Sequence, residues 1–224
     1  MGSILKITDK IGLISHMSLS EKLFRKLEVT DLIDLGAGLN PQQDMREDLN
    51  IRQLLIDLNY PEEKKARVIR KQIDVLDFNS LINEVKDFNQ SVGISETKID
   101  AVVSIQNIEH LERKQGENLL DFLGVIARKI VIVETPNGFV FQAGTSENPF
   151  QEHLSGWTVQ DFKSRGYKVR GTSGLKVLKK KSNKGEYRLN FKGMRFLDVL
   201  LSRILCIHYF PRACFNLYAY RIIK

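Results

Sequence analysis

The sequence is poor in cysteine and contains no long apolar run. Its two cysteines, Cys206 and Cys214, stand among mostly apolar residues and show no Cys/His spacing of the kind that holds structural zinc. They could pair, but two thiols in such surroundings are more often reduced and buried in the cytosol. No apolar stretch is long enough for a membrane span, and Lys6, Asp9 and Lys10 interrupt any signal-peptide core. We therefore expect a cytoplasmic protein.

Acidic residues are almost absent from one part of the chain. Residues 163–224 carry 16 Lys and Arg against two acids, Glu186 and Asp198, whereas residues 1–162 carry 18 basic and 25 acidic residues. The net charge of +7 hides this division. The basic segment is either a solvated surface or a contact surface for something anionic, such as a phosphorylated substrate, a membrane or a nucleic acid.

Length and composition favour one domain over residues 1–224. A chain of 224 residues can bury one α/β core but is short for two, and its 42% apolar content is ordinary for such a core. We expect a helical lead-in over 1–29, the core over 30–178, and a basic and apolar C-terminal segment over 179–224. Residues 182–185 are the best candidate for a flexible loop.

Alternating apolar patterns predict a mainly parallel sheet covered by helices on both faces. The segment 72–78 can be interpreted as a strand or as a piece of helix, and we place it as the third strand. Thr158 is a candidate cap for the helix that it precedes. The expected helices are 15–28, 114–128 and 158–165, and the expected strands are 30–35, 52–57, 72–78, 99–105, 129–134, 167–171, 175–178 and 215–223.

A glycine turn, Gly36-Ala37-Gly38, follows the first expected strand. Glycines permit a tight turn and let a ligand approach the backbone closely, and in open α/β sheets ligands bind beyond the carboxyl ends of the strands. The third glycine of the dinucleotide fingerprint G-x-G-x-x-G is missing. Asp34 stands two residues before the turn, where it can attract a ligand ammonium group.

Acids also end the next two expected strands. Asp57 lies 19 residues beyond Gly38, where a carboxylate can accept hydrogen bonds from both hydroxyls of a ribose. Asp74 and Asp77 end the third strand and are placed for an adenine amino group. Acids at three successive strand ends therefore predict a site for a nucleoside-containing cofactor at one edge of the sheet.

Five segments between residues 31 and 178 together resemble the class I S-adenosylmethionine-dependent methyltransferases. This resemblance covers about two thirds of the chain, and it departs from the family at Leu39-Asn40-Pro41, where many members have another glycine. It implies a Rossmann-like, mainly parallel seven-stranded sheet with a C-terminal antiparallel strand. The segments are Asp34-Leu35-Gly36-Ala37-Gly38, Ile73-Asp74-Val75, the run 100–111 that ends in Ile-Glu-His-Leu, the run 131–138 that ends in Thr-Pro-Asn-Gly, and 151–158.

The resemblance also implies S-adenosylmethionine as the cofactor and gives roles to individual residues. Asp57 is expected to bind the ribose, and Asp74 with the Val75 backbone to bind the adenine, with Asp77 as the alternative to Asp74. Gln106 is expected beside the methionine moiety and the reacting methyl group. The residues expected to hold the methionine end are Asp34, Gly36, Ala37 and Gly38.

Two histidines are candidates for a general base, which methyl transfer requires only if the acceptor must lose a proton. His110 follows the fourth expected strand and could act as the base or hold the fold by hydrogen bonds. His153 lies in a polar loop and could contact the acceptor or take its proton. Trp157 is expected to pack or to cover the site rather than to stack on an acceptor. We expect no metal site.

The acceptor is not identified by the sequence. We expect a small-molecule, glycan or lipid-precursor acceptor, because no Asn-Pro-Pro-aromatic motif for base methylation is present and few aromatics interleave the lysines, so that nucleic acid is disfavoured. The other candidates are a catalytically silent cofactor-binding scaffold, a nucleic-acid-directed methyltransferase that uses the basic C-terminal region, and a dehydrogenase. The amphipathic segment 194–210 is expected to pack on the core or on a second copy, or to contact an anionic membrane surface.

Overall fold

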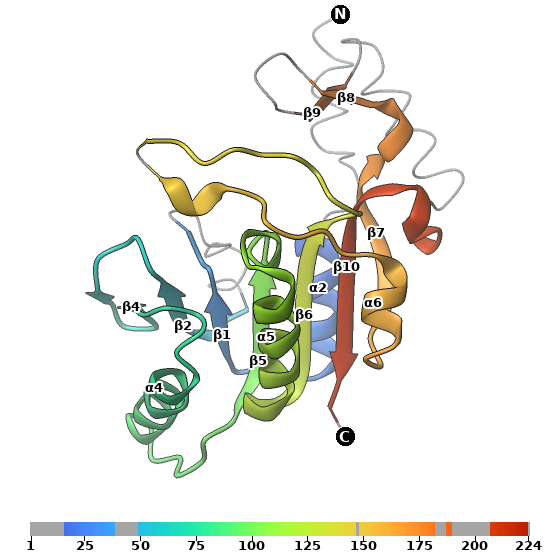
Figure 1. Cartoon of the computed structure of the whole chain (residues 1–224). Helices are drawn as coiled ribbons and strands as arrows, with labels where there is room; N and C mark the ends of the chain where they lie inside the picture. The colour runs from blue at the N-terminus through green and yellow to red at the C-terminus, as the bar shows by residue number, and fades with distance from the viewer. Residues whose placement is uncertain (1–15, 39–48, 147, 182–186, 190–206, 224) are drawn as a thin grey trace, which may run out of the picture.

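A computed structural model describes residues 16–38, 49–146, 148–181, 187–189 and 207–223. Eight strands form its central sheet (Figure 1). Five adjacent strands run parallel to one another, and the strand nearest the C-terminus, β10 (Cys214–Ile222), runs antiparallel to both of its neighbours. In spatial order they are β3 (Glu63–Lys64), β4 (Val68–Gln72), β2 (Arg52–Asp57), β1 (Asp31–Leu35), β5 (Ile99–Ile105), β6 (Ala127–Pro136), β10 (Cys214–Ile222) and β7 (Lys168–Leu175).

Helices cover both faces of this sheet (Figure 1). On one face Phe24 of the first helix packs with Leu32, Ala101 and Ile130. On the other face the side chains that alternate with these, such as Ile33, pack with the remaining helices. Because both faces are covered, the central strands are buried along their whole length, which explains their apolar runs. The helices are α2 (His16–Lys26), α4 (Phe78–Gln90), α5 (Arg113–Ile126) and α6 (Val159–Lys163).

Short 3-10 turns and a small ribbon complete the described chain. Among the described residues, no helix has the length and apolarity that crossing a membrane requires. The turns are η1 (Ile108–His110), η2 (Pro149–Gln151), η3 (Lys176–Leu178), η4 (Ile207–Tyr209) and η5 (Pro211–Ala213), and the ribbon pairs β8 (Lys179–Lys181) with β9 (Tyr187–Leu189).

The structure confirms a mainly parallel, Rossmann-like sheet with helices on both faces and an antiparallel strand near the C-terminus. The sheet has one strand more than the seven expected, because two-residue β3 pairs antiparallel with β4 and forms the edge beyond it. The expected helix 15–28 is α2, and Thr158 caps α6 by accepting a hydrogen bond from the Asp161 backbone N–H.

The third strand was placed wrongly. It is β4, which ends at Gln72, whereas 72–78 had been expected. The apolar residues Val75 and Leu76 belong to a turn instead, and Asp77 begins a helix that was not foreseen, α4, by accepting from the Ser80 backbone N–H. Leu81, Val85 and Phe88 form the buried side of this helix at helical spacing.

A second correction concerns the segment 175–178, which is not a strand. β7 continues through Leu175, and η3 follows it. Three other expectations lie outside the described residues: the loop Leu39-Asn40-Pro41, the loop 182–185, and all of 194–206. Of the expected amphipathic segment, only η4 and the residue after it are described.

Candidate functional site

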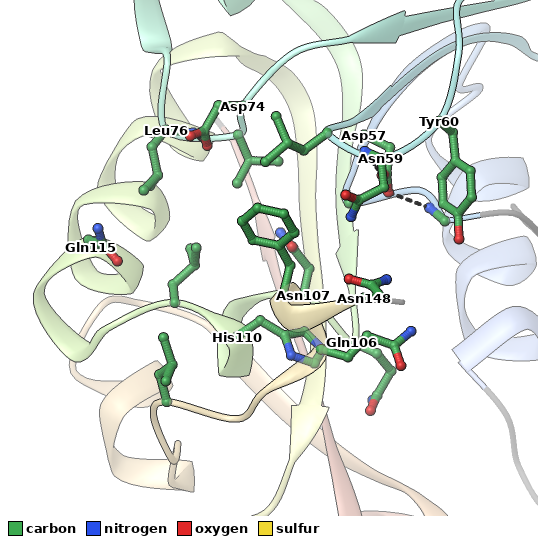
Figure 2. Close-up of a pocket in the computed structure, with 18 residues that line it drawn as sticks. Asp57, Asn59, Tyr60, Asp74, Leu76, Gln106, Asn107, His110, Gln115 and Asn148 are labelled. Atoms are coloured by element: carbon green, nitrogen blue, oxygen red, sulfur yellow. Dashed lines mark hydrogen bonds between the residues drawn. The ribbon is translucent and has the colours of Figure 1, made fainter. Parts of the chain in front are cut away.

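A cavity of about 380 Å³ opens at the carboxyl ends of β1, β2, β4 and β5 (Figure 2). This is the edge at which a parallel α/β sheet normally binds its ligand. Its described wall has no lysine or arginine and consists of Gly36, Gly38, Asp57, Leu58, Asn59, Tyr60, Asp74, Val75, Leu76, Gln106, Asn107, His110, Leu111, Gln115, Asn148, Phe150, Gln151 and Leu154.

The glycine turn lies at one end of this cavity. Gly36 and Gly38 both have positive φ, 75° and 62°, which favours glycine, and a Cβ at Gly36 would collide with the side chain of Asn107. The Gly36 and Ala37 backbone N–H groups both donate to the Ile56 carbonyl, which ties the turn to β2. Asp34 is buried at the end of β1. Neither Asp34 nor Ala37 lines the described wall.

Asp57 joins the turn to the cavity. One carboxylate oxygen accepts from the Gly38 N–H at 2.8 Å and the other from the Asn59 N–H at 2.8 Å, and each oxygen keeps a further lone pair. Arg70 fixes the same turn from the other side by donating to the Gly38 carbonyl at 2.9 Å. The acid is therefore held rigidly while its carboxylate still borders the cavity.

Asp74, and not Asp77, borders the cavity. Asp74 accepts a hydrogen bond from the Leu76 N–H, which shapes the turn after β4, and Val75 and Leu76 add an apolar wall. Asp77 points to the first turn of α4, where the hydrogen bonds from the Ser80 hydroxyl and backbone N–H lower its carboxyl pKa. Of the two acids, Asp74 lines the described cavity and Asp77 does not.

Gln106 stands where two cavities meet. Its φ of 51° is unusual for a residue with a side chain, and its N–H donates to the Glu134 carbonyl at 2.8 Å. It shares the wall of the first cavity and that of a second cavity of about 390 Å³, as do His110 and Gln151. The other residues of the second cavity are Glu109, Pro136, Val140, Phe141, Gln142, His153 and Phe215.

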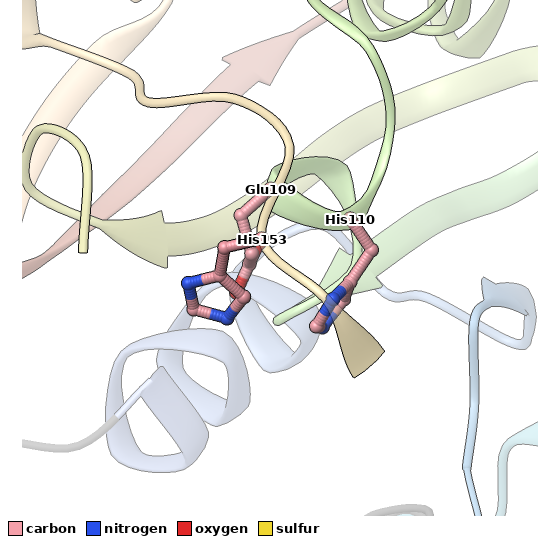
Figure 3. Close-up of side chains that lie close together, drawn as sticks. All are labelled: Glu109, His110 and His153. Carbon is pink, nitrogen blue, oxygen red and sulfur yellow. The ribbon is translucent and has the colours of Figure 1, made fainter. Parts of the chain in front are cut away.

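The second cavity brings together the two candidate bases (Figure 3). The ring centroids of His110 and His153 lie 4.8 Å apart, with the rings at 70° to each other. His110 Nδ1 lies 3.0 Å from the Glu152 carbonyl oxygen, and His153 Nδ1 lies 2.6 Å from that of Val140. Burial lowers the pKa of both histidines below the ordinary 6.5, which favours the neutral imidazole.

Glu109 lies beside these histidines and is 2% exposed. One of its carboxylate oxygens accepts from the Thr135 hydroxyl at 2.9 Å, while the other, Oε1, has no hydrogen-bond partner within the described structure. Burial raises the pKa of the Glu109 carboxyl to about 8. A buried carboxyl oxygen left without a partner is costly, and because Glu109 lines the second cavity this oxygen is available to a ligand there.

The loop between β6 and α6 forms one side of both cavities. The Leu154 and Ser155 N–H groups donate to the Glu109 carbonyl at 2.8 and 3.1 Å, which holds this loop against η1. Trp157 is fully buried and its indole N–H donates to the Ser155 hydroxyl at 3.0 Å, so that it packs, as expected, rather than stacking on a ligand. Large apolar side chains of the loop remain exposed: Phe139, Phe141, Phe150 and Leu154.

Several wall residues were not foreseen. Asn59 and Tyr60 follow β2, and Asn107 follows β5, so their position just after strand ends was a usable signal. Gln115, Asn148 and Phe150 come from α5 and the long loop, and no periodicity indicates that those segments face the cavity.

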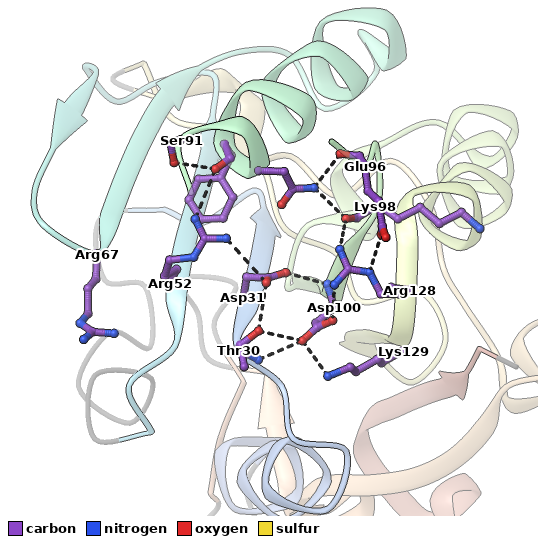
Figure 4. Close-up of polar contacts among 12 residues, drawn as sticks. Thr30, Asp31, Arg52, Arg67, Ser91, Glu96, Lys98, Asp100, Arg128 and Lys129 are labelled. Atoms are coloured by element: carbon purple, nitrogen blue, oxygen red, sulfur yellow. Dashed lines mark hydrogen bonds and ion pairs between the residues drawn. The ribbon is translucent and has the colours of Figure 1, made fainter. Parts of the chain in front are cut away.

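The opposite edge of the sheet carries a different polar cluster (Figure 4). Asp100, 1% exposed, lies 2.9 Å from both Arg128 Nη1 and Lys129 Nζ and accepts from Thr30. Asp31 accepts from the Asp100 N–H at 2.8 Å. Burial alone would raise the pKa of Asp100, but the hydrogen bonds from Lys129 and Thr30 outweigh it and bring the pKa below its ordinary value.

No family model matches the sequence, and no curated protein does. Solved structures do share the fold. The methyltransferase domain of bacterial CtHen1-CN superposes with a TM-score of 0.51 at 16% identity, over 93% of this chain and 97% of that one. For 1,6-didemethyltoxoflavin-N1-methyltransferase of Burkholderia thailandensis, solved with 1,6-didemethyltoxoflavin and S-adenosylhomocysteine, the TM-score is 0.52 at 12% identity, over 93% and 78%.

A third structure, small RNA methyltransferase HEN1, gives a TM-score of 0.50 at 14% identity over 93% of this chain and 26% of that one. All three superpose on 93% of this chain in spite of sequence identities of at most 16%. Likeness at such identities establishes architecture, while activity must be argued from the site. The chain has the Rossmann-like fold of the class I S-adenosylmethionine-dependent methyltransferases.

Proposed function

We propose that this protein is an S-adenosylmethionine-dependent methyltransferase, with the cofactor in the first cavity and the methyl acceptor in the second. The observation that carries this proposal is the meeting of the two cavities at Gln106 and His110, on the edge of the sheet that bears the glycine turn. Two ligands bound there would adjoin each other at these two residues.

The residues of the first cavity suit this cofactor. The close backbone approach at Gly36 leaves no room for a side chain, and Asp57 borders the cavity with lone pairs for two ribose hydroxyls. Asp74 and Val75 line the same cavity and would bind the adenine. The methionine end would lie against the turn 36–38, above Asp34. Bound there, the cofactor supplies an electrophilic methyl group.

The protein's own contribution is chiefly orientation. Holding two reactants in line can supply roughly 7–11 kcal/mol of the barrier in favourable cases. Gln106 and His110 border both cavities and can therefore position the acceptor against the cofactor side. Where the acceptor must lose a proton, the neutral imidazoles of His110 and His153 are the candidate bases.

The second cavity favours an uncharged acceptor with an apolar part. Its described wall holds no lysine or arginine that would pair with a phosphate, and exposed Phe139, Phe141 and Phe150 belong to the loop that forms its side. This supports a small-molecule, glycan or lipid-precursor acceptor over a nucleic acid. The protein need not enter a membrane to meet such an acceptor, and we place it in the cytoplasm.

Calorimetry tests this proposal. Wild-type protein should bind S-adenosylmethionine and S-adenosylhomocysteine and should not bind NAD. Asp57→Ala should weaken both about 100-fold, because two hydrogen bonds to a charged carboxylate are lost, at about 1.5 kcal/mol each. Asp87→Ala, an exposed acid on α4, is the matched control and should bind as wild type does. Binding of NAD without binding of the sulfonium cofactor would refute the proposal.

A further inference from the structure

We propose that Glu109, His110 and His153 bind a divalent transition-metal ion in the wall of the second cavity (Figure 3). The sequence led us to expect no metal site, and the two histidines stand 43 positions apart in it. The fold brings the three together because the loop before α6 docks on η1 through the Leu154 and Ser155 N–H groups.

The possible ligand atoms of the three side chains lie close to one another. One potential ligand atom from each side chain lies within 4.8 Å of the other two. Ligands about 2.0–2.2 Å from a shared ion stand roughly 3–3.5 Å apart in tetrahedral or octahedral geometry. Small side-chain rotations, with no movement of the backbone, would therefore bring the three atoms onto one ion.

The two histidines are held in the tautomer that leaves Nε2 free to bind a metal. Both use Nδ1 against a backbone carbonyl, of Glu152 for His110 and of Val140 for His153. A carbonyl oxygen can only accept, so in each ring Nδ1 carries the hydrogen and Nε2 keeps the lone pair. A carbonyl that fixes the tautomer in this way is the usual outer partner of a metal-bound histidine.

The carboxyl group of Glu109 has one oxygen available to a cation. Its Oε1 is buried and has no partner in the described structure, while its other oxygen is oriented by the Thr135 hydroxyl. A divalent cation would satisfy Oε1 and offset the cost of burying the charge. An uncharged, protonated Glu109 is the competing explanation, and it predicts that no metal binds.

The donor set limits the class of metal. Two imidazole nitrogens and one carboxylate oxygen suit Zn²⁺, Co²⁺, Fe²⁺ or Mn²⁺ better than Ca²⁺ or Mg²⁺, which prefer oxygen alone. Three protein ligands leave coordination positions open, as in catalytic rather than structural sites. These positions would face the second cavity, so the ion could hold an oxygen or nitrogen of the acceptor. A histidine whose Nε2 binds the ion cannot also take a proton, so the ion would replace His110 and His153 as the group that activates the acceptor. This role rests on the proposed function, whereas metal binding does not.

The test is a titration with metal alone. Full-length protein is stripped with a chelator and titrated with Co²⁺ by calorimetry, with no cofactor present. We expect one ion per chain, much weaker binding of Mg²⁺, and at least about a tenfold loss of Co²⁺ affinity in Glu109→Gln and in His153→Ala. His208→Ala removes a histidine of η4, which lines neither cavity, and should bind Co²⁺ as wild type does.

Two further measurements keep the result decisive. Co²⁺ should raise the melting temperature of the wild-type protein by mass action, an experiment that needs no variant. Thr135→Val leaves all three ligands in place and should weaken Co²⁺ binding by about tenfold, because it removes the outer hydrogen bond to Glu109. Absence of both binding and a melting shift in wild type, or equal affinity in the ligand variants, would overturn the site. Wild-type protein that binds Co²⁺ but does not bind S-adenosylmethionine would instead refute the proposed function and leave the metal site standing.

Discussion

Two buried carboxyl groups, Asp100 and Glu109, lie at opposite edges of the central sheet and differ in how their oxygens are satisfied. At the amino ends of the strands, Asp100 is surrounded by Arg128, Lys129 and Thr30, and each of its oxygens has a partner (Figure 4). At the carboxyl ends, Glu109 is equally buried, but one of its oxygens has no partner within the described structure.

This difference separates stability from binding. A buried carboxylate with every lone pair satisfied supports the fold and has little left to offer a ligand. A buried carboxyl with an unsatisfied oxygen costs stability, and such costs are typical of functional sites. The amino-terminal edge should therefore respond to mutation through unfolding and the carboxyl-terminal edge through binding.

The largest effect is expected at the amino-terminal edge. Asp100→Asn should reduce the free energy of unfolding by roughly 2–3 kcal/mol, because charge-assisted hydrogen bonds from Lys129 and Arg128 are lost. The affinity for S-adenosylmethionine should stay within twofold of the wild-type value. Denaturant unfolding and calorimetry measure the two quantities. Glu96→Gln is the control: Glu96 also pairs with Arg128 but is 60% exposed, and its loss should cost less than 1 kcal/mol. Similar losses in both variants would contradict the comparison.

Acid should remove the same contribution. The pKa of Asp100 is lower in the folded protein than its ordinary 3.8, so Asp100 stabilises the fold fully above about pH 4 and loses this contribution as the pH falls through the folded pKa. The unfolding free energies of wild type and Asp100→Asn should therefore differ by a constant amount above about pH 5 and converge below pH 4. A difference that persists unchanged at pH 2–3 would show that the charge of Asp100 is not what stabilises this edge.

A smaller effect is expected at Asp74, on the carboxyl-terminal edge. Asp74→Ala should weaken S-adenosylmethionine binding about tenfold, since one hydrogen bond to a charged group is worth about 1.5 kcal/mol. The melting temperature should change little, because within the described part of the chain the side chain makes one hydrogen bond, a local one from the Leu76 N–H. Unchanged affinity in calorimetry would remove Asp74 from the cofactor site.

The smallest effect is expected three residues further on. Asp77→Ala should lower the unfolding free energy slightly, through loss of the α4 cap, and should leave cofactor affinity unchanged. Chemical denaturation and calorimetry on the pair Asp74→Ala and Asp77→Ala compare a binding acid with a capping acid within one turn. An affinity loss in Asp77→Ala would reverse the two assignments.

The sequence predicted what depends on local pattern. Buried apolar runs located β1, β5 and β6, and the glycine turn located the cavity. The prediction of the third strand was wrong because Val75 and Leu76 continue the apolar pattern after the chain has already turned. The start of α4 is marked by its cap Asp77, which accepts a hydrogen bond from the Ser80 N–H.

The parts that were missed depend on contacts between distant segments. His153 meets Glu109 only because the intervening loop returns to η1, and Asp100 meets Arg128 only because β5 and β6 pair side by side. Neither meeting leaves a periodic signal in the chain. The residue types were visible in the sequence, but their neighbours were not.

The position of β10 also has a consequence for synthesis. β10 lies between β6 and β7, and β7 makes its ladder with β10, although β7 precedes it in the chain. On the ribosome, β7 must therefore wait without this partner until residues 214–222 emerge, and β6 presents an open edge during that interval. We expect chains halted before residue 214 to be prone to edge-to-edge association. In the cofactor half of the sheet, by contrast, β2, β4, β5 and β6 each pair with a strand that has already been made.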